Sequence, residues 1–199
     1  NQKDNRHLAG LSYTPVFEPA TPTEVYHYYL AAAKLAREKH QAVILRLTTH
    51  VCHQKEKVSF GAYEPKEFDQ TPLFDPANGP YVPIAAAVFP MKRRALKRLE
   101  EVREYAEKSP LNRWTDHGNP KRGVITMGLP YLSLLDVLEE VGPKPDLLKL
   151  GLVHPLPRDL IADFLMKHRE VKILEELDDI VETEVKALAF DRKIDVRIL

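Results

Sequence analysis

The sequence of 199 residues predicts an α/β protein in which a partial α/β segment is followed by a parallel-sheet domain. Three observations support this fold class. A helical pattern followed by a short apolar run lies near the start, residues 61–90 are rich in proline, and four short strands alternate with three helices from Gly123 onward. The last pattern is typical of a parallel sheet wound through right-handed crossovers.

The first segment predicts a helix followed by a buried strand. Thr21 can cap a helix, Pro22 suits its first turn, and Glu24 lies where it can answer the cap. Apolar residues then recur at three- and four-residue spacing: Val25, Tyr28, Tyr29, Ala32, Leu35 and Ala36. The next run, residues 42–49, is short, β-rich and mostly apolar, as in a parallel strand covered on both faces.

The middle of the chain predicts a crossing segment rather than another sheet unit. Residues 61–90 combine many prolines with few periodic apolar positions. Residues 91–108 then carry apolar side chains at helical spacing between charged ones. We expect an amphipathic helix there, which serves as a linker or as a docking element.

The last 80 residues predict a small α/β domain. The expected strands and helices alternate along the chain. The strands are Val124–Gly128, Leu147–Gly151, Val171–Leu174 and Ile194–Ile198, and the helices run up to Val141, from Arg158 to His168 and from Ile180 to Phe190.

Composition excludes several function classes. The 29 Lys and Arg residues balance 29 Asp and Glu residues, so no strong field would attract nucleic acid or an acidic membrane. The single cysteine, Cys52, excludes an internal disulfide and any four-cysteine zinc or iron–sulfur site built from this chain alone. No apolar run approaches the roughly 20 residues that span a bilayer, and no leader opens the chain. We expect a cytoplasmic protein, and the start at Asn1 indicates a fragment.

The best local candidate for a site follows the strand of residues 42–49. The polar cluster from Thr48, Thr49 and His50 to His53 lies where a buried strand meets its loop, and ligands usually bind at such ends of a parallel sheet. The alternative is that Arg46, Thr48 and Thr49 satisfy backbone groups or pair across a subunit interface. We expect no metal at Cys52 and His53, because neighbours on an extended chain point apart and further ligands are missing.

Two other patterns are weaker. Gly128-Leu129-Pro130 opens a helix whose N–H groups could receive a phosphate, but a dinucleotide site would need a glycine fingerprint. Glu175 and Glu176 precede Asp178 and Asp179, which resembles an acidic group for acid–base chemistry. The alternative is that Asp178 or Asp179 caps the following helix. We therefore expect no catalytic residue in this chain.

Several of these segments also resemble a known family. They are residues 1–6, 16–24, 45–53, "GVITMGLPYLSLLDVLEEVG", "LLKLGLVHPLP" and "ILEELDDIVETEVKAL". In this order they are similar to the large (alpha) subunits of indolepyruvate ferredoxin oxidoreductases, members of the 2-oxoacid:ferredoxin oxidoreductase family. The resemblance implies that residues 1–61 end a pyrimidine-side thiamine diphosphate domain, that residues 62–118 form a linker with an amphipathic helix, and that residues 119–199 form a transketolase C-terminal-like domain.

The resemblance also implies a reaction. The parent enzyme is expected to use thiamine diphosphate, Mg²⁺ and 4Fe-4S clusters to decarboxylate aryl 2-oxoacids such as indolepyruvate oxidatively to acyl-CoA. Its expected partners are the other domains of the same subunit, a smaller partner subunit, ferredoxin and CoA, in an oligomer without nucleic acid or membrane.

The same resemblance implies that the chemistry lies mostly outside this chain. The activating glutamate is expected before Asn1, and the pyrophosphate-binding and cysteine segments after Leu199. No cofactor is therefore expected on the chain alone. Arg46, Thr48, Thr49 and His53 are carried over as positions near substrate or cofactor, although His50 stands where the family often has Arg.

We thus expect a mainly structural and assembly role within this oxidoreductase. Two alternatives stay open: a non-catalytic α/β interaction module, and the same role in a pyruvate or branched-chain 2-oxoacid oxidoreductase.

Overall fold

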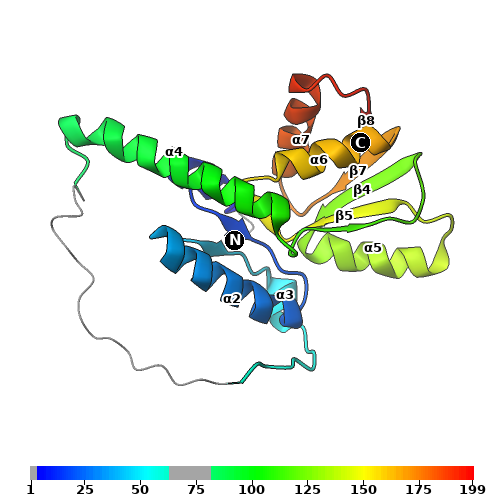
Figure 1. Cartoon of the computed structure of the whole chain (residues 1–199). Helices are drawn as coiled ribbons and strands as arrows, with labels where there is room; N and C mark the ends of the chain where they lie inside the picture. The colour runs from blue at the N-terminus through cyan, green and yellow to red at the C-terminus, as the bar shows by residue number, and fades with distance from the viewer. Residues whose placement is uncertain (1–3, 63–81) are drawn as a thin grey trace.

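The computed structural model describes residues 4–62 and 82–199, which form two sheets with helices around them (Figure 1). The strands are β1 Val16–Phe17, β2 Ile44–Leu45, β3 Arg113–Thr115, β4 Arg122–Met127, β5 Asp146–Leu150, β6 Leu152–His154, β7 Glu170–Leu174 and β8 Arg197–Ile198. The helices are α1 His7–Ser12, α2 Pro22–Lys39, α3 Thr49–His53, α4 Ala85–Lys108, α5 Gly128–Glu140, α6 Arg158–Lys167 and α7 Ile180–Asp191. In this part of the chain no helix is long and apolar enough to span a bilayer.

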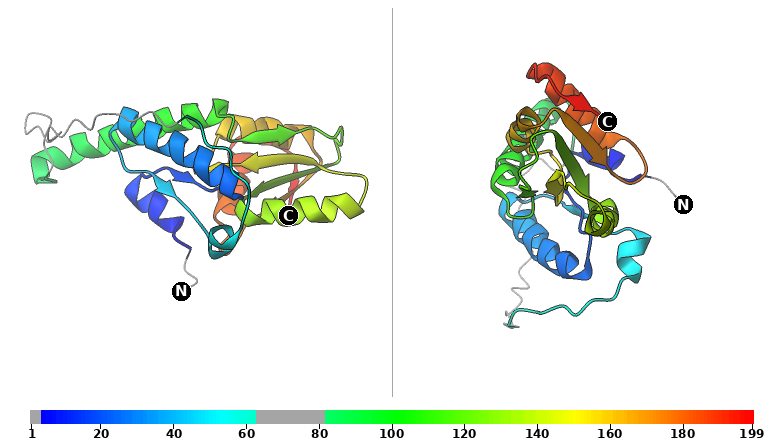
Figure 2. Two further views of the ribbon diagram at one scale, coloured as in Figure 1. Left: turned by 90° about the horizontal axis from the view of Figure 1, so that it is seen from below. Right: turned by 90° about the vertical axis from the view of Figure 1, so that its right-hand side faces the viewer.

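The smaller sheet has the order β2-β1-β6. Its central strand β1 runs parallel to β2 and antiparallel to β6. Side chains of β1 alternate, so Phe17 packs with α2 and the end of α4, while Val16 joins the core beneath the larger sheet. Helices α2 and α4 therefore lie side by side over one face of this sheet (Figure 2).

The predicted start of helix α2 is confirmed, whereas the short helix α1 before it was not predicted. Thr21 caps α2 by accepting a hydrogen bond from the backbone N–H of Glu24 at 3.1 Å. Glu24 in turn accepts from the N–H of Ala20 at 2.8 Å, one residue before the cap. This reciprocal arrangement satisfies two amides that the helix itself leaves unpaired.

The strand predicted over residues 42–49 is much shorter in the structure. Only Ile44 and Leu45 form β2, which lies half-buried at a sheet edge, and the chain then turns into α3. The last backbone hydrogen bond between β2 and β1 runs from the N–H of Arg46 to the carbonyl oxygen of Phe17, at 2.8 Å. The neighbouring strand ends there because Pro19 has no N–H with which to continue the ladder.

The larger sheet has the order β3-β5-β4-β7-β8, and its four predicted strands run parallel. Helix α5 covers one face, and α6 and α7 cover the other (Figure 1). Several predicted ends shift: Gly128 begins α5 and Gly151 lies between β5 and β6 instead of each ending a strand, and β8 holds only two of the five predicted residues. The antiparallel edge strand β3 was not predicted.

Strand β6 links the two sheets. It follows β5 after only Gly151 but pairs with β1, so the region predicted as a separate domain contributes a strand to the first sheet. Buried residues of both sheets also form one core cluster, including Val16, Met127 and Val153. The domain limits near residues 62 and 118 stay predictions.

Helix α4 begins earlier than predicted. It starts at Ala85 rather than Met91, because the run Ala85–Ala87 favours helix, and it contains Pro90. Its second half packs against α2 and α6. Most of the predicted crossing segment, residues 63–81, lies outside the described residues.

Gly151, between β5 and β6, allows the chain to pass close to Leu111 and Tyr28. A Cβ there would lie 2.6 Å from the carbonyl oxygen of Leu111 and would also meet the hydroxyl of Tyr28. We predict that Gly151→Ala lowers the free energy of unfolding by about 2 kcal/mol or more in urea denaturation, because backbone must move. Gly10→Ala is the control, since nothing lies within 4 Å there. Equal stability of the two variants would contradict this packing.

Candidate functional site

The topology marks one place where ligands would be expected. After β4 the chain enters α5 on one face of the larger sheet, and after β7 it enters α7 on the other. Strands β4 and β7 are neighbours, with Ile125 beside Ile173. Their carboxyl ends therefore form a topological switch point, the usual ligand crevice in α/β sheets.

Side chains from the first segment fill this crevice. Glu18 follows β1, Arg46 follows β2, and Nη1 of Arg46 donates to Oε1 of Glu18 at 2.6 Å. Both residues are buried, with exposures of 0% and 5%. A Cβ on Gly128, at the end of β4, would lie 2.6 Å from Oε1 of Glu18, so the carboxylate sits against the start of α5. Gly128 also has a φ of +52°, which favours glycine.

Arg6 closes the crevice from the β7 side. Its guanidinium donates to Oε2 of Glu175 at 2.7 Å, and to the carbonyl oxygens of Glu176 at 2.6 Å and Asp178 at 2.9 Å. It also holds the carboxylate of Asp4 in several hydrogen bonds. Arg6 is 4% exposed, so its charge is neutralised within the protein rather than by solvent. We call Asp4, Arg6, Glu18, Arg46, Glu175 and Glu176 the junction cluster.

Glu175 also caps α7, which corrects the predicted cap. Its carboxylate accepts from the N–H of Val181 at 3.1 Å and of Glu182 at 2.9 Å. Asp179 occupies the N-cap position without a capping hydrogen bond, and Asp178 pairs instead with His7 at 2.8 Å. Glu175 performs this role because Arg6 holds its side chain toward the helix start.

The junction cluster balances burial against charge. Burial raises the pKa of Glu18, and the charges of Arg46 and Arg6 oppose that rise. Burial also acts on Asp4, but its hydrogen bonds with Arg6 and the charge of Arg6 hold the pKa of Asp4 below its usual value. Each buried charge of the cluster therefore depends on its partner, because loss of one partner leaves the other buried and unpaired.

Several buried polar atoms of this region have no hydrogen-bond partner among the described residues. They are Oε2 of Glu18, Nε of Arg46, Oγ1 of Thr48, Oγ1 of Thr126 and Oε2 of Glu176. Donors and acceptors are both present, so the region could bind polar groups of either kind. Protein side chains nevertheless already fill the centre of the crevice.

The structure separates the four residues expected near substrate or cofactor. Arg46 lies in the junction cluster, and Thr48 is a half-buried residue at the start of α3. Thr49 and His53 are exposed on α3. The structure thus places Arg46 among the buried charges and leaves Thr49 and His53 on the surface. Their proximity to substrate or cofactor stays a prediction.

Sequence reasoning missed Glu18 and Arg6 as site residues. A carboxylate inside the apolar run Val16–Ala20 was a usable signal, because an acid there needs a buried partner. Arg6 gave no comparable signal, since its partner Glu175 is 169 residues away.

A second buried charge group joins α2 to the larger sheet. Lys149 of β5 is 1% exposed, pairs with Glu24 and donates to the hydroxyl of Tyr28 at 2.7 Å. Arg113 also reaches Glu24, at 3.1 Å. Burial lowers the pKa of Lys149 to about 8, with Glu24 opposing the change. Lys149 is closed to solvent, whereas Glu24 and Arg113 are partly exposed, and the group ties the start of α2 to β5.

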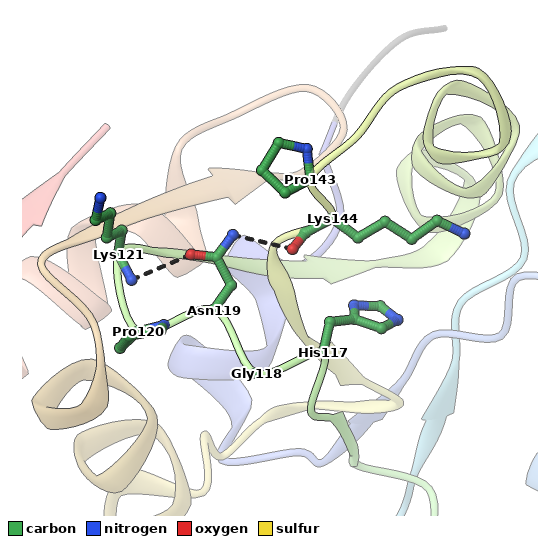
Figure 3. Close-up of a pocket in the computed structure, with 7 residues that line it drawn as sticks. All are labelled: His117, Gly118, Asn119, Pro120, Lys121, Pro143 and Lys144. Carbon is green, nitrogen blue, oxygen red and sulfur yellow. Dashed lines mark hydrogen bonds between the residues drawn. The ribbon is translucent and has the colours of Figure 1, made fainter.

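An open pocket of about 520 Å³ lies at the opposite, amino edge of the larger sheet. Figure 3 shows Lys121 and Lys144 pointing in different directions, while Asn119 accepts from the N–H of Lys121 and donates to the carbonyl oxygen of Lys144. The N–H of His117 is bound to Asp146 at 2.8 Å. Because these polar groups bind one another and do not converge, the pocket does not form a ligand site.

The described residues do not fit a metal or an iron–sulfur cluster. Within residues 4–62 and 82–199, no three His, Cys, Asp or Glu side chains come together as a metal site. The only cysteine of the sequence, Cys52, is exposed and free. Four thiolate ligands would have to come from elsewhere.

Comparison with curated proteins identifies relatives along the whole chain. The indolepyruvate oxidoreductase subunit IorA of Methanothermobacter thermautotrophicus is 33% identical over 199 residues, and that of Pyrococcus abyssi is 33% identical over 203. The Archaeoglobus fulgidus IorA subunit is 31% identical over 188 residues. The chain is related to a segment of IorA subunits. This confirms the resemblance stated from the sequence.

The relationship is partial on the side of the relatives. The chain aligns over 100% of its own length with the first of these IorA subunits but spans 32% of that subunit. No protein-family model matches the sequence. Among solved structures, a 2-oxoglutarate:ferredoxin oxidoreductase from Magnetococcus marinus aligns with a TM-score of 0.44 and 16% identity, covering 58% of this chain and 20% of that one.

Breaking the junction cluster is expected to destabilise the chain. We predict that Arg46→Leu lowers the free energy of unfolding by about 3 kcal/mol, because Glu18 would stay buried without its partner. The double variant Glu18→Gln, Arg46→Leu should recover part of this loss. Arg158→Leu, which breaks an exposed pair with Asp191, should cost about 1 kcal/mol or less. Similar losses for the two single variants in urea denaturation would exclude a special role for the buried pair.

Lys149 is expected to make stability depend on pH. In the folded protein its pKa is about 8, whereas in the unfolded chain it is near 10.5. Between these values the unfolded chain binds more protons, so this contribution to stability rises with pH from about 8 toward about 10. Below pH 8 the lysine is mostly charged in both the folded and the unfolded chain, so the cost of burying its charge stays nearly constant. Lys149→Met should remove the rise when urea denaturation is compared at pH 7.5, 8.5 and 9.5, and a persisting rise would assign it to another group.

Proposed function

We propose that this chain is the part of an indolepyruvate:ferredoxin oxidoreductase large subunit that joins two domains and fixes their spacing. The observation that carries the proposal is identity of 31–33% to IorA subunits along essentially the whole chain. The parent enzyme would decarboxylate aryl 2-oxoacids oxidatively to acyl-CoA and pass electrons to ferredoxin. It would do so in the cytoplasm together with a smaller partner subunit.

Thiamine diphosphate, Mg²⁺ and 4Fe-4S clusters would supply the chemistry of the parent enzyme. The described residues offer neither a metal-binding group nor a set of thiolates. As the resemblance implies, we assign cofactor binding to the rest of the subunit. The role of this chain would be to orient those parts.

Two features of the chain support a structural role. The switch-point crevice is filled by Glu18, Arg46 and Arg6, so it holds protein together rather than a ligand. Strand β6 places both sheets on one core. We retain Thr49 and His53, which are exposed on α3, as positions that would face substrate, cofactor or the adjoining domain.

A titration tests the division of labour. In isothermal titration calorimetry with thiamine diphosphate and Mg²⁺, the isolated chain should give no binding heat, whereas the full-length subunit should bind. Tight binding by the isolated chain that requires Mg²⁺ would place the cofactor site here. Residues 48–53 would then be the first to mutate.

An activity assay tests the reaction. The full-length subunit with its partner should reduce ferredoxin when given indolepyruvate and CoA. Faster reduction with pyruvate or a branched-chain 2-oxoacid would change the substrate class. Absence of reduction with every 2-oxoacid, in a cofactor-loaded complex, would favour a non-catalytic interaction module.

A further inference from the structure

Charge is distributed unevenly along α4. Residues 82–99 contain five cationic side chains and no carboxylate: Lys92, Arg93, Arg94, Lys97 and Arg98. Residues 100–108 contain four glutamates. One helix therefore has a purely basic first half and a mixed second half.

The two halves of α4 also differ in packing. The second half is anchored, since Lys39 pairs with Glu101 at 2.7 Å and Glu107 accepts from the N–H groups of Asp159 and Leu160 at 2.9 Å. The first half projects beyond both sheets (Figures 1 and 2). None of its five cations forms an ion pair with a residue of 4–62 or 82–199.

The projecting half carries apolar side chains between its charges. Phe89 is 72% exposed and Leu96 is 44% exposed. At 3.6 residues per turn, these two lie on one side of the helix with the exposed Ala85 and Lys92, and Arg93 and Lys97 border them. We call Ala85, Phe89, Lys92, Arg93, Leu96 and Lys97 the basic face of α4.

We propose that the basic face of α4 docks onto an acidic surface with an apolar centre on a separate protein, the partner subunit of the parent enzyme. This inference rests on the proposed function for the identity of the partner. Exposed Phe89 and Leu96 supply apolar surface that is desolvated on contact, while the bordering cations pair with carboxylates at the rim of the partner's surface.

A separate polypeptide suits this charge pattern better than a further domain of the same chain. Charge that the described residues leave unpaired speeds the diffusional encounter of two molecules, whereas a covalently linked domain is already at high local concentration. Nucleic acid suits it less, because the side chains at the centre of the face are apolar and the chain as a whole has a net charge of zero.

The test measures association of the full-length subunit with its partner subunit by stopped-flow fluorescence. The triple variant Lys92→Glu, Arg93→Glu, Lys97→Glu should lower the association rate constant at least tenfold at low salt, with a smaller difference at 0.5 M salt. Phe89→Ser with Leu96→Ser should instead raise the dissociation rate constant.

A matched control reverses three cations elsewhere. Lys121→Glu, Arg122→Glu, Lys144→Glu changes exposed residues at the amino edge of the larger sheet and should leave both rate constants unchanged. Equal rate constants for the two triple variants would overturn the proposal. A lowered melting temperature of the first triple variant without partner would also overturn it, because the face would then pack within its own subunit.

Two further outcomes separate this inference from the proposed function. In one of them, the wild-type subunit binds phosphatidylserine vesicles and the first triple variant does not. If partner association is unchanged in that variant, the result would assign the face to a membrane. Slower association of that variant in a complex without 2-oxoacid oxidation would keep the docking face and refute the oxidoreductase. An active complex in which that variant leaves the rate constants unchanged would keep the oxidoreductase and refute the docking face.

Discussion

The buried ion pair between Glu18 and Arg46 is the constraint on which the arrangement of the two sheets depends. Each charge can leave water only because the other is within hydrogen-bond distance, and both follow strand ends, with Glu18 against the start of α5. Glu175, at the start of α7, is likewise paired with a buried charge, that of Arg6. The first segment and the larger sheet therefore cannot separate without exposing or unpairing several charges.

A neutral hydrogen-bond bridge complements these ion pairs. The side chain of Asn112 donates to the carbonyl oxygen of Ala106 at 2.9 Å and accepts from the N–H groups of Gly151 and Leu152. It thereby fixes the end of α4 to the turn that leads from the larger sheet into the smaller one. Because this end is held while the first half projects, α4 extends from the molecule as an arm in one direction.

Sequence periodicity predicted the elements that depend on local pattern. Helices α2, α5, α6 and α7 and strands β4, β5 and β7 follow from the spacing of apolar residues, since each buries one face or both. The strands β3 and β6 have three residues each and exist through distant pairing, so no local period marks them. Strand β2 was overestimated because its apolar run continues after its partner strand has ended.

The candidate site shows the same division between local and distant information. Arg46 and Thr48 could be singled out because polar residues at the end of an apolar run are visible in the sequence. Their surroundings could not, because Glu18 lies 28 residues from Arg46 and Glu175 lies 169 residues from Arg6. Pairing of such charges is decided by how strands are ordered in space, which a single sequence does not encode locally.

The filled crevice changes what the switch point can do. An open α/β sheet usually leaves this position for a ligand, yet here the carboxylate of Glu18 lies against the start of α5 and Arg6 covers the carboxyl end of β7. Replacing a ligand by charged side chains of the same chain converts a binding crevice into a joint. A joint of buried ion pairs also restricts the relative orientation of its two parts, because each pair tolerates only a narrow range of distance and direction. Such a joint suits a segment whose proposed task is to hold catalytic parts at a fixed spacing.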